Sequence, residues 1–424
     1  MRILYITFFC KPFNSIPSLR TNAFLEYLPE EGIEVDVLTR HYDSGELAGN
    51  SFESTYSSVE EMKEPYRVVD HIIYTNFEDN NEGIKFSEKL PSGVRTIYNY
   101  FQKDLYHKNW IKYAIHAFEK ELKCRKYDFI VASYHPFVSL HLASLLSKKH
   151  KIPWIADFRD SFIGVTEETK VSLIYKKLLL KKVLKNVSGV VSVSKAMNNQ
   201  LNKYGGKNGR LAPKVVVNNG VDSKISSKVD SQDQDTFKKI EEIKSESTLL
   251  FVHTGTIYEG QDIEFFLNFI QEYNKKHNTS IRLVCVGLTK NQIDFKKLTD
   301  SGAIIFDRVS NTTSIRIQQI ADVLIIPAWY PKRYTGFVAK IFEYIHSGNH
   351  VICSPYPVTD LREFLVHFKN VFIASGFDSM ENYIQKVISN RDNKIKTPNN
   401  HPMLFRKYWI KIFAEFLKQL KKTD

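Results

Sequence analysis

The stretch RYTGFVAKIFEYIHSG, residues 333–348, places two charged side chains among apolar neighbours. Lys340 and Glu343 are three residues apart, so in a helix they share one face of its first two turns. Gly336 and Phe337 precede them and would present backbone N–H groups at the helix start, where the dipole favours negative charge. The lysine can reach a pyrophosphate, and the glutamate can accept hydrogen bonds from ribose hydroxyls. The stretch therefore predicts a nucleotide site. The alternative is a surface Lys–Glu pair, which stabilises a helix by only about 0.2–0.5 kcal/mol.

Two further groups of candidate residues follow apolar runs that are typical of strands. Gly255 and Thr256 lie in TGTIYEG, directly after LLFVH. A glycine turn there lets a ligand approach the backbone, and the next helix would offer N–H groups to a phosphate. Asp157, Arg159 and Asp160 follow the run WI, and alternating charges at a strand end indicate a polar ligand. The alternative for these three residues is an Arg–Asp network that satisfies itself and holds a loop.

Several motifs with known chemistry are absent. The sequence contains neither G-x-G-x-x-G nor G-x-x-x-x-G-K-[ST], so we expect no dinucleotide cofactor. It also lacks the G-x-S-x-G elbow and any cluster of His, Cys or carboxylates at metal-ligand spacing, so we expect no metal site. His135 and His253 stand alone near strand ends, where a histidine is more often a structural residue.

Composition bounds the class of protein and its partners. The length of 424 residues favours two domains, and the formal net charge of +12 indicates an anionic partner or a surface of solvated lysines. No basic–aromatic module is visible, so we expect no nucleic-acid partner. Four scattered cysteines indicate a reducing compartment. Residues 129–147 contain no Lys, Arg, Asp or Glu, but their proline, histidines and serines argue against a membrane span. We therefore expect a cytoplasmic protein with only peripheral membrane contact.

Short β-branched runs alternate with segments of helical length along the chain. This pattern predicts an α/β protein with two doubly wound, Rossmann-like domains that face each other across a cleft. We expect an N-terminal domain over residues 1–218, a C-terminal domain over 219–400 and a C-terminal helix over 401–424 that returns to the first domain. The predicted strands are ILYITFF, EVDVLTR, RVVDHIIYT, DFIVASY, WIADFRD, GVVSVS, LLFVHTG, IRLVCVG, AIIFDR, VLIIPA, HVICSP and VFIAS. A polar insertion over roughly residues 43–108 has no pattern that predicts a fold.

Longer blocks of sequence occur in an order that is typical of one family. They are MRILYITFFCKPFNSIPSLRTNAFLEYLPEEGIEVDVLT, YDFIVASYHPFVSLHLASLLSKKHKIPWIADFRDSF, VVSVSKAM, VNNGVD, HTGTIYEG and KIFEYIHSGNHVI. Together they resemble the GT-B glycosyltransferases, specifically the family 4-like group of bacterial cell-surface polysaccharide synthesis. The resemblance covers most of the chain.

The resemblance implies a nucleotide-sugar donor that is held mainly by the C-terminal domain. The implied donor-binding residues are Gly255, Thr256, Gly336, Phe337, Lys340 and Glu343. Within this set, Glu343 would bind the ribose, and the two glycine turns with Lys340 would meet the diphosphate. The family is retaining and metal-independent, so backbone N–H groups, a helix start and cations would stabilise the leaving diphosphate.

The resemblance also implies residues on the acceptor side. Asp157, Arg159 and Asp160 would act as catalytic residues that face the acceptor or the transferred sugar, and Arg20 would lie in a loop bordering the cleft.

Two positions depart from the family pattern. Thr335 stands where relatives often have a second glutamate, and EGQD follows GTIY where relatives usually have basic residues. The charge that neutralises the phosphates must then come from Lys340, or from Lys332, Arg333 or Arg308.

We therefore expect a glycosyltransferase that moves a sugar from a nucleotide sugar to a glycan or lipid-linked glycan acceptor. The alternatives are an epimerase or phosphorylase on the same scaffold, and a non-catalytic protein that binds nucleotide sugars. The segment KVSLIYKKLLLKKVLK, residues 170–185, carries six lysines and no acid, and four of them fall within about an 80° arc of a helix. That face would meet an anionic membrane, unless the helix simply packs its leucines into the core.

Overall fold

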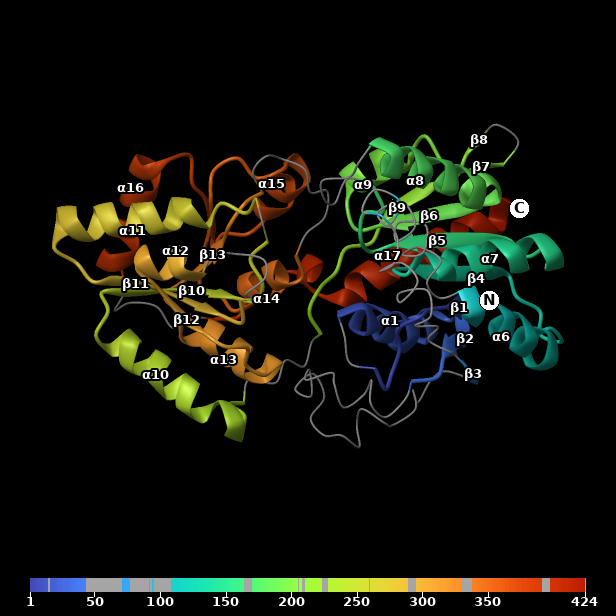
Figure 1. The fold of residues 1–424 in the computed structure, drawn as a ribbon, viewed down its shortest axis with the longest axis horizontal. Coiled ribbons are helices and arrows are strands. Elements are labelled where there is room, and N and C mark those ends of the chain that lie inside the picture. The colour runs from blue at the N-terminus through green and yellow to red at the C-terminus, as the bar shows by residue number, and fades with distance from the viewer. Residues whose placement is uncertain are drawn as a thin grey trace. The chain divides into compact units, whose positions relative to one another are not determined.

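The computed structural model describes most of the chain (Figure 1). The described residues are 1–13, 16–42, 71–76, 91, 94, 108–163, 170–204, 206–207, 210–222, 228–258, 260–288, 295–329, 338–390 and 397–423. Two predicted donor-binding residues, Gly336 and Phe337, lie outside this set, as do Thr335 and most of the polar insertion.

The chain forms two compact units. Unit 1 comprises residues 1–218 and 407–424, and unit 2 comprises residues 219–406. Each unit is built around a parallel sheet with helices between successive strands, which is the α/β organisation that the alternating runs predict.

Unit 1 contains a parallel sheet of seven strands in the order β3-β2-β1-β4-β5-β6-β9. The strands are β1 (Arg2–Ile6), β2 (Glu34–Arg40), β3 (His71–Thr75), β4 (Phe129–Tyr134), β5 (Trp154–Phe158), β6 (Gly189–Ser192) and β9 (Lys214–Val216), with a small hairpin of β7 (Gly206–Lys207) and β8 (Arg210–Leu211). The helices are α1 (Ile16–Tyr27), α6 (Lys108–Ala117), α7 (Phe137–His150), α8 (Lys170–Val183), α9 (Lys195–Leu201) and α17 (Arg406–Thr423), with short turns at Pro29–Glu31, Phe118–Leu122 and Leu184–Asn186. All six strands predicted in this half are confirmed, while β9 is a seventh, too short to stand out in the sequence.

Unit 2 contains a parallel sheet of six strands in the order β12-β11-β10-β13-β14-β15. The strands are β10 (Leu249–Thr254), β11 (Ile281–Val286), β12 (Ala303–Phe306), β13 (Val323–Ile326), β14 (His350–Cys353) and β15 (Val371–Ile373). The helices are α10 (Gln234–Ser245), α11 (Ile263–His277), α12 (Phe295–Asp300), α13 (Asn311–Ile320), α14 (Lys340–His346), α15 (Thr359–Leu365) and α16 (Phe377–Ser389), with short turns at Ser231–Asp233 and Pro402–Leu404. Every predicted strand of this half is confirmed, because strands buried on both faces read as continuous apolar runs.

The strand order of unit 2 fixes where a ligand can bind. After β10 the chain adds β11 and β12 on one side, and it then returns to add β13 on the other side of β10. Successive connections therefore leave the sheet in opposite directions at the carboxyl ends of β10 and β13, and ligands of open parallel sheets bind at such switch points. In unit 1 the equivalent point lies between β1 and β4.

The last helix, α17, packs within unit 1 (Figure 1). Its Phe413 is fully buried, with the ring centroid 5.1 Å from that of Phe24 in α1. A Cβ atom added at Gly189 of β6 would lie 3.0 Å from side-chain atoms of Phe416 and Leu420, so the helix passes directly over the strand. This contact explains the apolar face that the sequence shows near its end. Within the described residues, no helix is long and apolar enough to cross a bilayer.

Candidate functional site

The candidate site of unit 2 begins with the contact between Lys340 and Gly255. Lys340 is the first residue of α14, and Gly255 follows β10 with a φ of +96°, a conformation that favours glycine. A Cβ atom at this glycine would lie 2.2 Å from Cε of Lys340, so the lysine stem runs across the glycine turn. The ammonium Nζ donates a hydrogen bond to Oγ1 of Thr254 at 3.3 Å. The structure thus brings together two residues that lie far apart in the sequence.

The side chain of Glu343 is held by Gln318, which the sequence analysis did not select as a site residue. Nε2 of Gln318, a buried residue of α13, donates to Oε2 of Glu343 at 3.0 Å and to Oγ1 of Thr254 at 3.1 Å. Tyr344 fixes the same strand end, since its hydroxyl accepts from Thr254 N at 2.7 Å and donates to Thr254 O at 3.1 Å. The polar network therefore orients Glu343, whose side chain is only partly buried, beside the end of β10. No motif marks Gln318, because its role follows from packing.

Three neighbouring strand ends contribute to this edge of the sheet. Gly287 follows β11 with a φ of +80°, and a Cβ atom there would touch the Cα atoms of Arg308 at 3.6 Å and Gly255 at 3.8 Å. Arg308 follows β12 and is exposed. The glycines let these turns approach one another, so the guanidinium of Arg308 and the ammonium of Lys340 belong to the same edge.

The electrostatics of this edge favour an anion. Burial lowers the pKa of Lys340, the negative charge of Glu343 opposes that shift, and the positive charge of Arg308 adds to it. Two cations that destabilise each other are stabilised together when an anion binds between them. Of the four cations that the sequence left as candidates for phosphate binding, Lys340 and Arg308 lie at this edge, whereas Lys332 and Arg333 lie outside the described residues.

One detail of the predicted turn is wrong. The sequence suggested that Gly255 and Thr256 lead directly into a helix with open N–H groups. Helix α11 begins only at Ile263, and the side chain of Asp262 already caps it by accepting a hydrogen bond from Phe265 N at 3.2 Å. The backbone around the glycine turn, rather than a helix start, is therefore what this loop can offer a ligand.

In unit 1, Asp157 forms a buried ion pair with Arg20. Nη2 and Nε of Arg20 lie 2.8 Å and 3.2 Å from the two carboxylate oxygens of Asp157, which is fully buried in β5. Nη1 of the same arginine donates to the carbonyl oxygen of Asn218 at 3.3 Å. The prediction that Arg20 lies in a loop is wrong, because it lies within α1 with its side chain buried. For Asp157 the geometry favours the alternative of an Arg–Asp network, since burial leaves the carboxylate no open side.

Arg159 and Asp160 follow β5 and are less deeply buried than Asp157. Nη1 of Arg159 lies 2.7 Å from Oδ2 of Asp160, whose side chain is 46% exposed. Because Tyr134 of β4 pairs with Phe158 of β5, His135 emerges next to Arg159 at the same edge of the sheet. His135 is exposed. Desolvation lowers its pKa, the positive charges of Arg159 and Lys176 lower it further, and Asp160 opposes them. Lys176 of α8 therefore belongs to this group, although the sequence gave no sign of it.

His253, by contrast, has the environment of a structural residue. Its ring is buried at the end of β10, with Nδ1 3.4 Å from the carbonyl oxygen of Ile325, and it packs edge-on against Tyr344. Burial lowers its pKa to about 4, and the nearby charge of Lys340 adds to the shift. In the part of the chain that the structure describes, no group of three or more His, Cys, Asp or Glu residues is arranged to hold a metal ion.

Comparison with known proteins agrees with this architecture. The sequence profile of Glycosyltransferase Family 4 matches residues 20–224, which is most of unit 1. No curated protein sequence matches the chain at a significant level.

Solved structures resemble the chain over nearly its whole length. HepE of Anabaena in complex with UDP is 13% identical with a TM-score of 0.55, and the match covers 100% of this chain and 98% of that one. The lipopolysaccharide outer core galactosyltransferase WaaB is 14% identical with a TM-score of 0.51, covering 99% and 100%. The UDP-GlcNAc 2-epimerase of Neisseria meningitidis bound to UDP-GlcNAc is 12% identical with a TM-score of 0.51, covering 99% and 100%.

At these identities the structural likeness establishes the fold. The chain has the GT-B fold of two Rossmann-like units. The profile match adds the family signature in its first half, so the resemblance to GT-B glycosyltransferases of the family 4-like group is confirmed.

The buried His253 makes a pH-dependent contribution to the stability of unit 2. Its pKa is about 4 in the folded chain against an ordinary value of 6.5, so the unfolded chain binds the proton more tightly. The contribution is complete above pH 6.5 and is lost as the pH falls towards 4, by about 3 kcal/mol in total at about 1.4 kcal/mol per pKa unit. His253→Gln should therefore flatten the dependence of the free energy of unfolding on pH between pH 7.5 and 4.5.

The measurement is native-state hydrogen exchange of the β10 and β13 amides, corrected for the intrinsic exchange rate at each pH. Carboxylates also titrate in this range, so the quantity to follow is the difference between wild type and variant. His367→Gln, at an exposed position, is the matched control and should leave the profile unchanged. Parallel profiles for wild type and His253→Gln would contradict the assignment.

Proposed function

We propose that the chain is a glycosyltransferase that moves a sugar from a nucleotide-sugar donor to a glycan or lipid-linked glycan acceptor, with retention of configuration, in cell-surface polysaccharide biosynthesis. The observation that carries the proposal is the convergence of the Gly255 turn, Lys340 and Glu343 at the switch point of unit 2. The UDP complex of HepE and the UDP-GlcNAc complex of the epimerase support a nucleotide-sugar ligand for this fold.

In this proposal unit 2 binds the donor. Glu343 accepts hydrogen bonds from the ribose hydroxyls through the oxygen lone pairs that Gln318 leaves open. The backbone of Gly255 and Thr256 approaches the diphosphate. Negative charge grows on the diphosphate as the glycosidic bond breaks, and fixed cations aimed at that charge stabilise the transition state. Lys340 and Arg308 supply those cations in place of the basic residues that are missing after GTIY, and the chemistry needs no metal ion.

Unit 1 contributes the acceptor side of the reaction. Asp160 and Arg159 lie at the carboxyl end of β5, with the carboxylate accessible to an acceptor hydroxyl. Asp157 takes a different part, because its buried pair with Arg20 fixes the end of the strand that carries them. We therefore assign it as a positioning residue.

An epimerase is the second candidate, since the Neisseria meningitidis UDP-GlcNAc 2-epimerase shares the fold. A non-catalytic nucleotide-sugar-binding protein is the third, and Thr335 in place of the second family glutamate favours it. Product analysis separates the three. Epimerisation or hydrolysis of a nucleotide sugar without an acceptor favours the epimerase, and tight binding without any turnover favours the binding protein.

Loss of the Glu343 carboxylate should weaken nucleotide binding. Hydrogen bonds to a charged group contribute about 1.5–3 kcal/mol, so Glu343→Ala should reduce the affinity for a nucleoside diphosphate on the order of ten- to a hundredfold. Titration calorimetry with UDP and GDP measures the effect. Glu272→Ala, on the exposed face of α11, is the matched control. Unchanged affinity for the nucleoside diphosphate in a folded Glu343→Ala protein would show that Glu343 does not bind the ribose.

Helix α8 has the features of a membrane-surface helix. Leu180 and Val183 are buried in the core, as the simple packing alternative requires. Ile174 and Leu178, however, are 59% and 61% exposed, so the helix also has an outward apolar pair.

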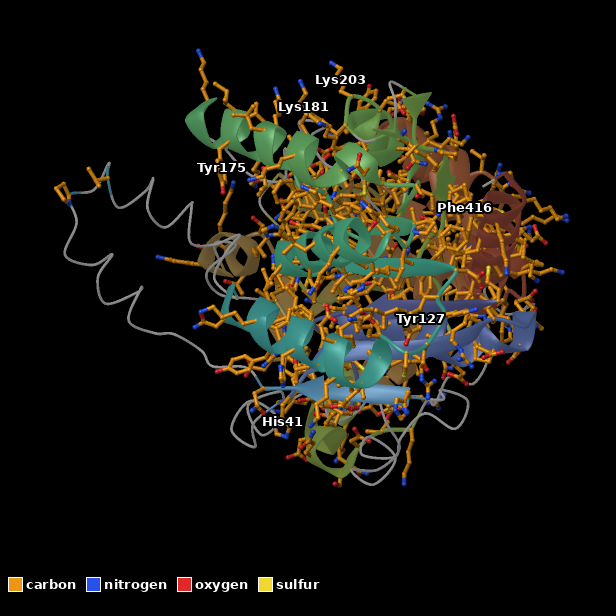
Figure 2. All side chains as sticks on the ribbon, turned by 90° about the vertical axis from the view of Figure 1, so that its right-hand side faces the viewer. His41, Tyr127, Tyr175, Lys181, Lys203 and Phe416 are labelled. Carbon is orange, nitrogen blue, oxygen red and sulfur yellow. The ribbon has the colours of Figure 1, made fainter. Side chains whose placement is uncertain are left out.

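The lysines share that outward face. Lys170, Lys177 and Lys181 of α8 are exposed, as is Lys185 in the turn Leu184–Asn186 that follows the helix. At 100° per residue Ile174 lies about 20° from Lys181 around the helix, and Leu178 about 60°. Figure 2 shows Lys181 pointing away from the sheet. Exposed apolar side chains among lysines are typical of helices that lie in the interface of an anionic membrane, and we propose peripheral contact of this kind.

Reversing these charges should abolish binding to anionic vesicles. Each surface lysine contributes about 1 kcal/mol, so replacing Lys170, Lys177, Lys181 and Lys185 with Glu should weaken partitioning by roughly a thousandfold or more. Co-sedimentation with vesicles containing phosphatidylglycerol measures the effect, and wild-type binding should fall as salt rises.

The control for the α8 variant reverses four exposed lysines of unit 2. They are Lys238, Lys239, Lys275 and Lys369. The net charge of the two variants is the same, so equal loss of binding in both would show that only total charge matters and that α8 is not the contact.

A further inference from the structure

Three basic side chains from three elements lie around one point of unit 1. His135 follows β4 and Arg159 follows β5, and the pairing of Tyr134 with Phe158 makes them neighbours. Lys176 reaches this edge from α8, with Nζ 5.3 Å from the ring centroid of Phe162.

The ring of Phe162 anchors this arrangement. It stacks on Phe137 at 4.6 Å and meets Tyr134 edge-on at 5.5 Å, so it lies against the end of β4 and the start of α7. The lysine above it is thereby held near the strand ends rather than in bulk solvent. The charges of Arg159 and Lys176 both act on the ring of His135.

One acid lies within this group. The carboxylate Oδ2 of Asp160 contacts Nη1 of Arg159 at 2.7 Å. Among the described residues, Nε of Arg159 is buried and has no hydrogen-bond partner. The group thus holds an unused N–H donor, an ammonium and an imidazole, which are the donors that phosphate oxygens accept.

We propose that His135, Arg159 and Lys176 bind the phosphate or diphosphate ester through which the acceptor is attached to its lipid. The inference rests on the proposed function and specifies its acceptor. Helix α8 links this group to the proposed membrane face, because Lys176 points to the strand ends while Ile174 and Leu178 form the outward pair beside the other lysines. A lipid held at the membrane by its chain would then present its phosphate to the inner side of the same helix.

The donor also contains a diphosphate, so the experiment must separate the two sources. The probe is farnesyl diphosphate, a short prenyl diphosphate that dissolves in water, titrated by calorimetry into the full-length protein saturated with UDP. We expect binding that UDP does not block. Lys176→Gln, His135→Gln and Arg159→Gln should each lower the affinity about tenfold or more, while leaving UDP affinity unchanged. Lys182→Gln, at an exposed position of α8 that belongs neither to this group nor to the four membrane-facing lysines, is the matched control and should have little effect.

Two further probes identify what is recognised. Farnesol has the prenyl chain without the diphosphate and should bind equally to wild type and variants. Inorganic pyrophosphate has the diphosphate without the prenyl chain, and the three substitutions should weaken its binding as they weaken that of farnesyl diphosphate. Thermal unfolding shows that each variant is folded, and Lys176→Gln, a change on a partly exposed helix face, keeps the test valid if Arg159→Gln destabilises the chain.

Three results would overturn the inference: no binding of farnesyl diphosphate, binding that all three variants retain, or competition by UDP that assigns the group to the donor diphosphate. Failure of the proposed function gives a different result. In that case UDP does not bind or Glu343→Ala leaves its affinity unchanged, whatever the prenyl probe does.

Discussion

The close approach of Lys340 to Gly255 is the constraint on which the site of unit 2 depends. A charged stem passes across a strand end where a single added carbon would lie 2.2 Å from Cε. The glycine therefore does two things, since its positive φ turns the chain away from β10 and its missing side chain makes room for the lysine. With the lysine in place, α14 begins beside the switch point and Glu343 follows one turn later. The chemistry of the site thus follows from a steric requirement of the backbone.

A buried polar network around Thr254 holds α14 in place against the end of β10. Thr254 receives hydrogen bonds from Gln318 and Lys340, and its backbone is bonded to the Tyr344 hydroxyl. Because unsatisfied polar groups inside a protein are costly, a network of this kind favours one orientation of α14 against β10 and α13. In unit 1 the ion pair of Arg20 and Asp157 has the equivalent effect, since it fixes the end of β5 to α1. Each unit therefore uses buried polar contacts to hold accessible polar groups at its strand ends.

Much of the fold could be predicted because parallel strands buried on both faces read as apolar runs, and twelve such runs became strands. The family resemblance also assigned Lys340 and Gly255 to one diphosphate site, and the structure places these two residues in contact. The rest depended on packing. Gln318 lies in the unremarkable segment RIQQI and matters only because α13 packs beside β10. Arg20 was misplaced in a loop because α1 has no clear amphipathic pattern, and Lys176 reaches the strand ends only through the aromatic contacts of Phe162.

The central claim is that a nucleotide occupies the switch point of unit 2. Hydrogen exchange of the full-length protein, with and without saturating nucleoside diphosphate, tests it most directly, because exchange reports where the ligand acts on the backbone. Protection should appear in the segment after β10, residues 255–257, and at the start of α14, residues 338–343. Protection confined to other strand ends, or none in a protein that binds the nucleotide, would contradict the claim.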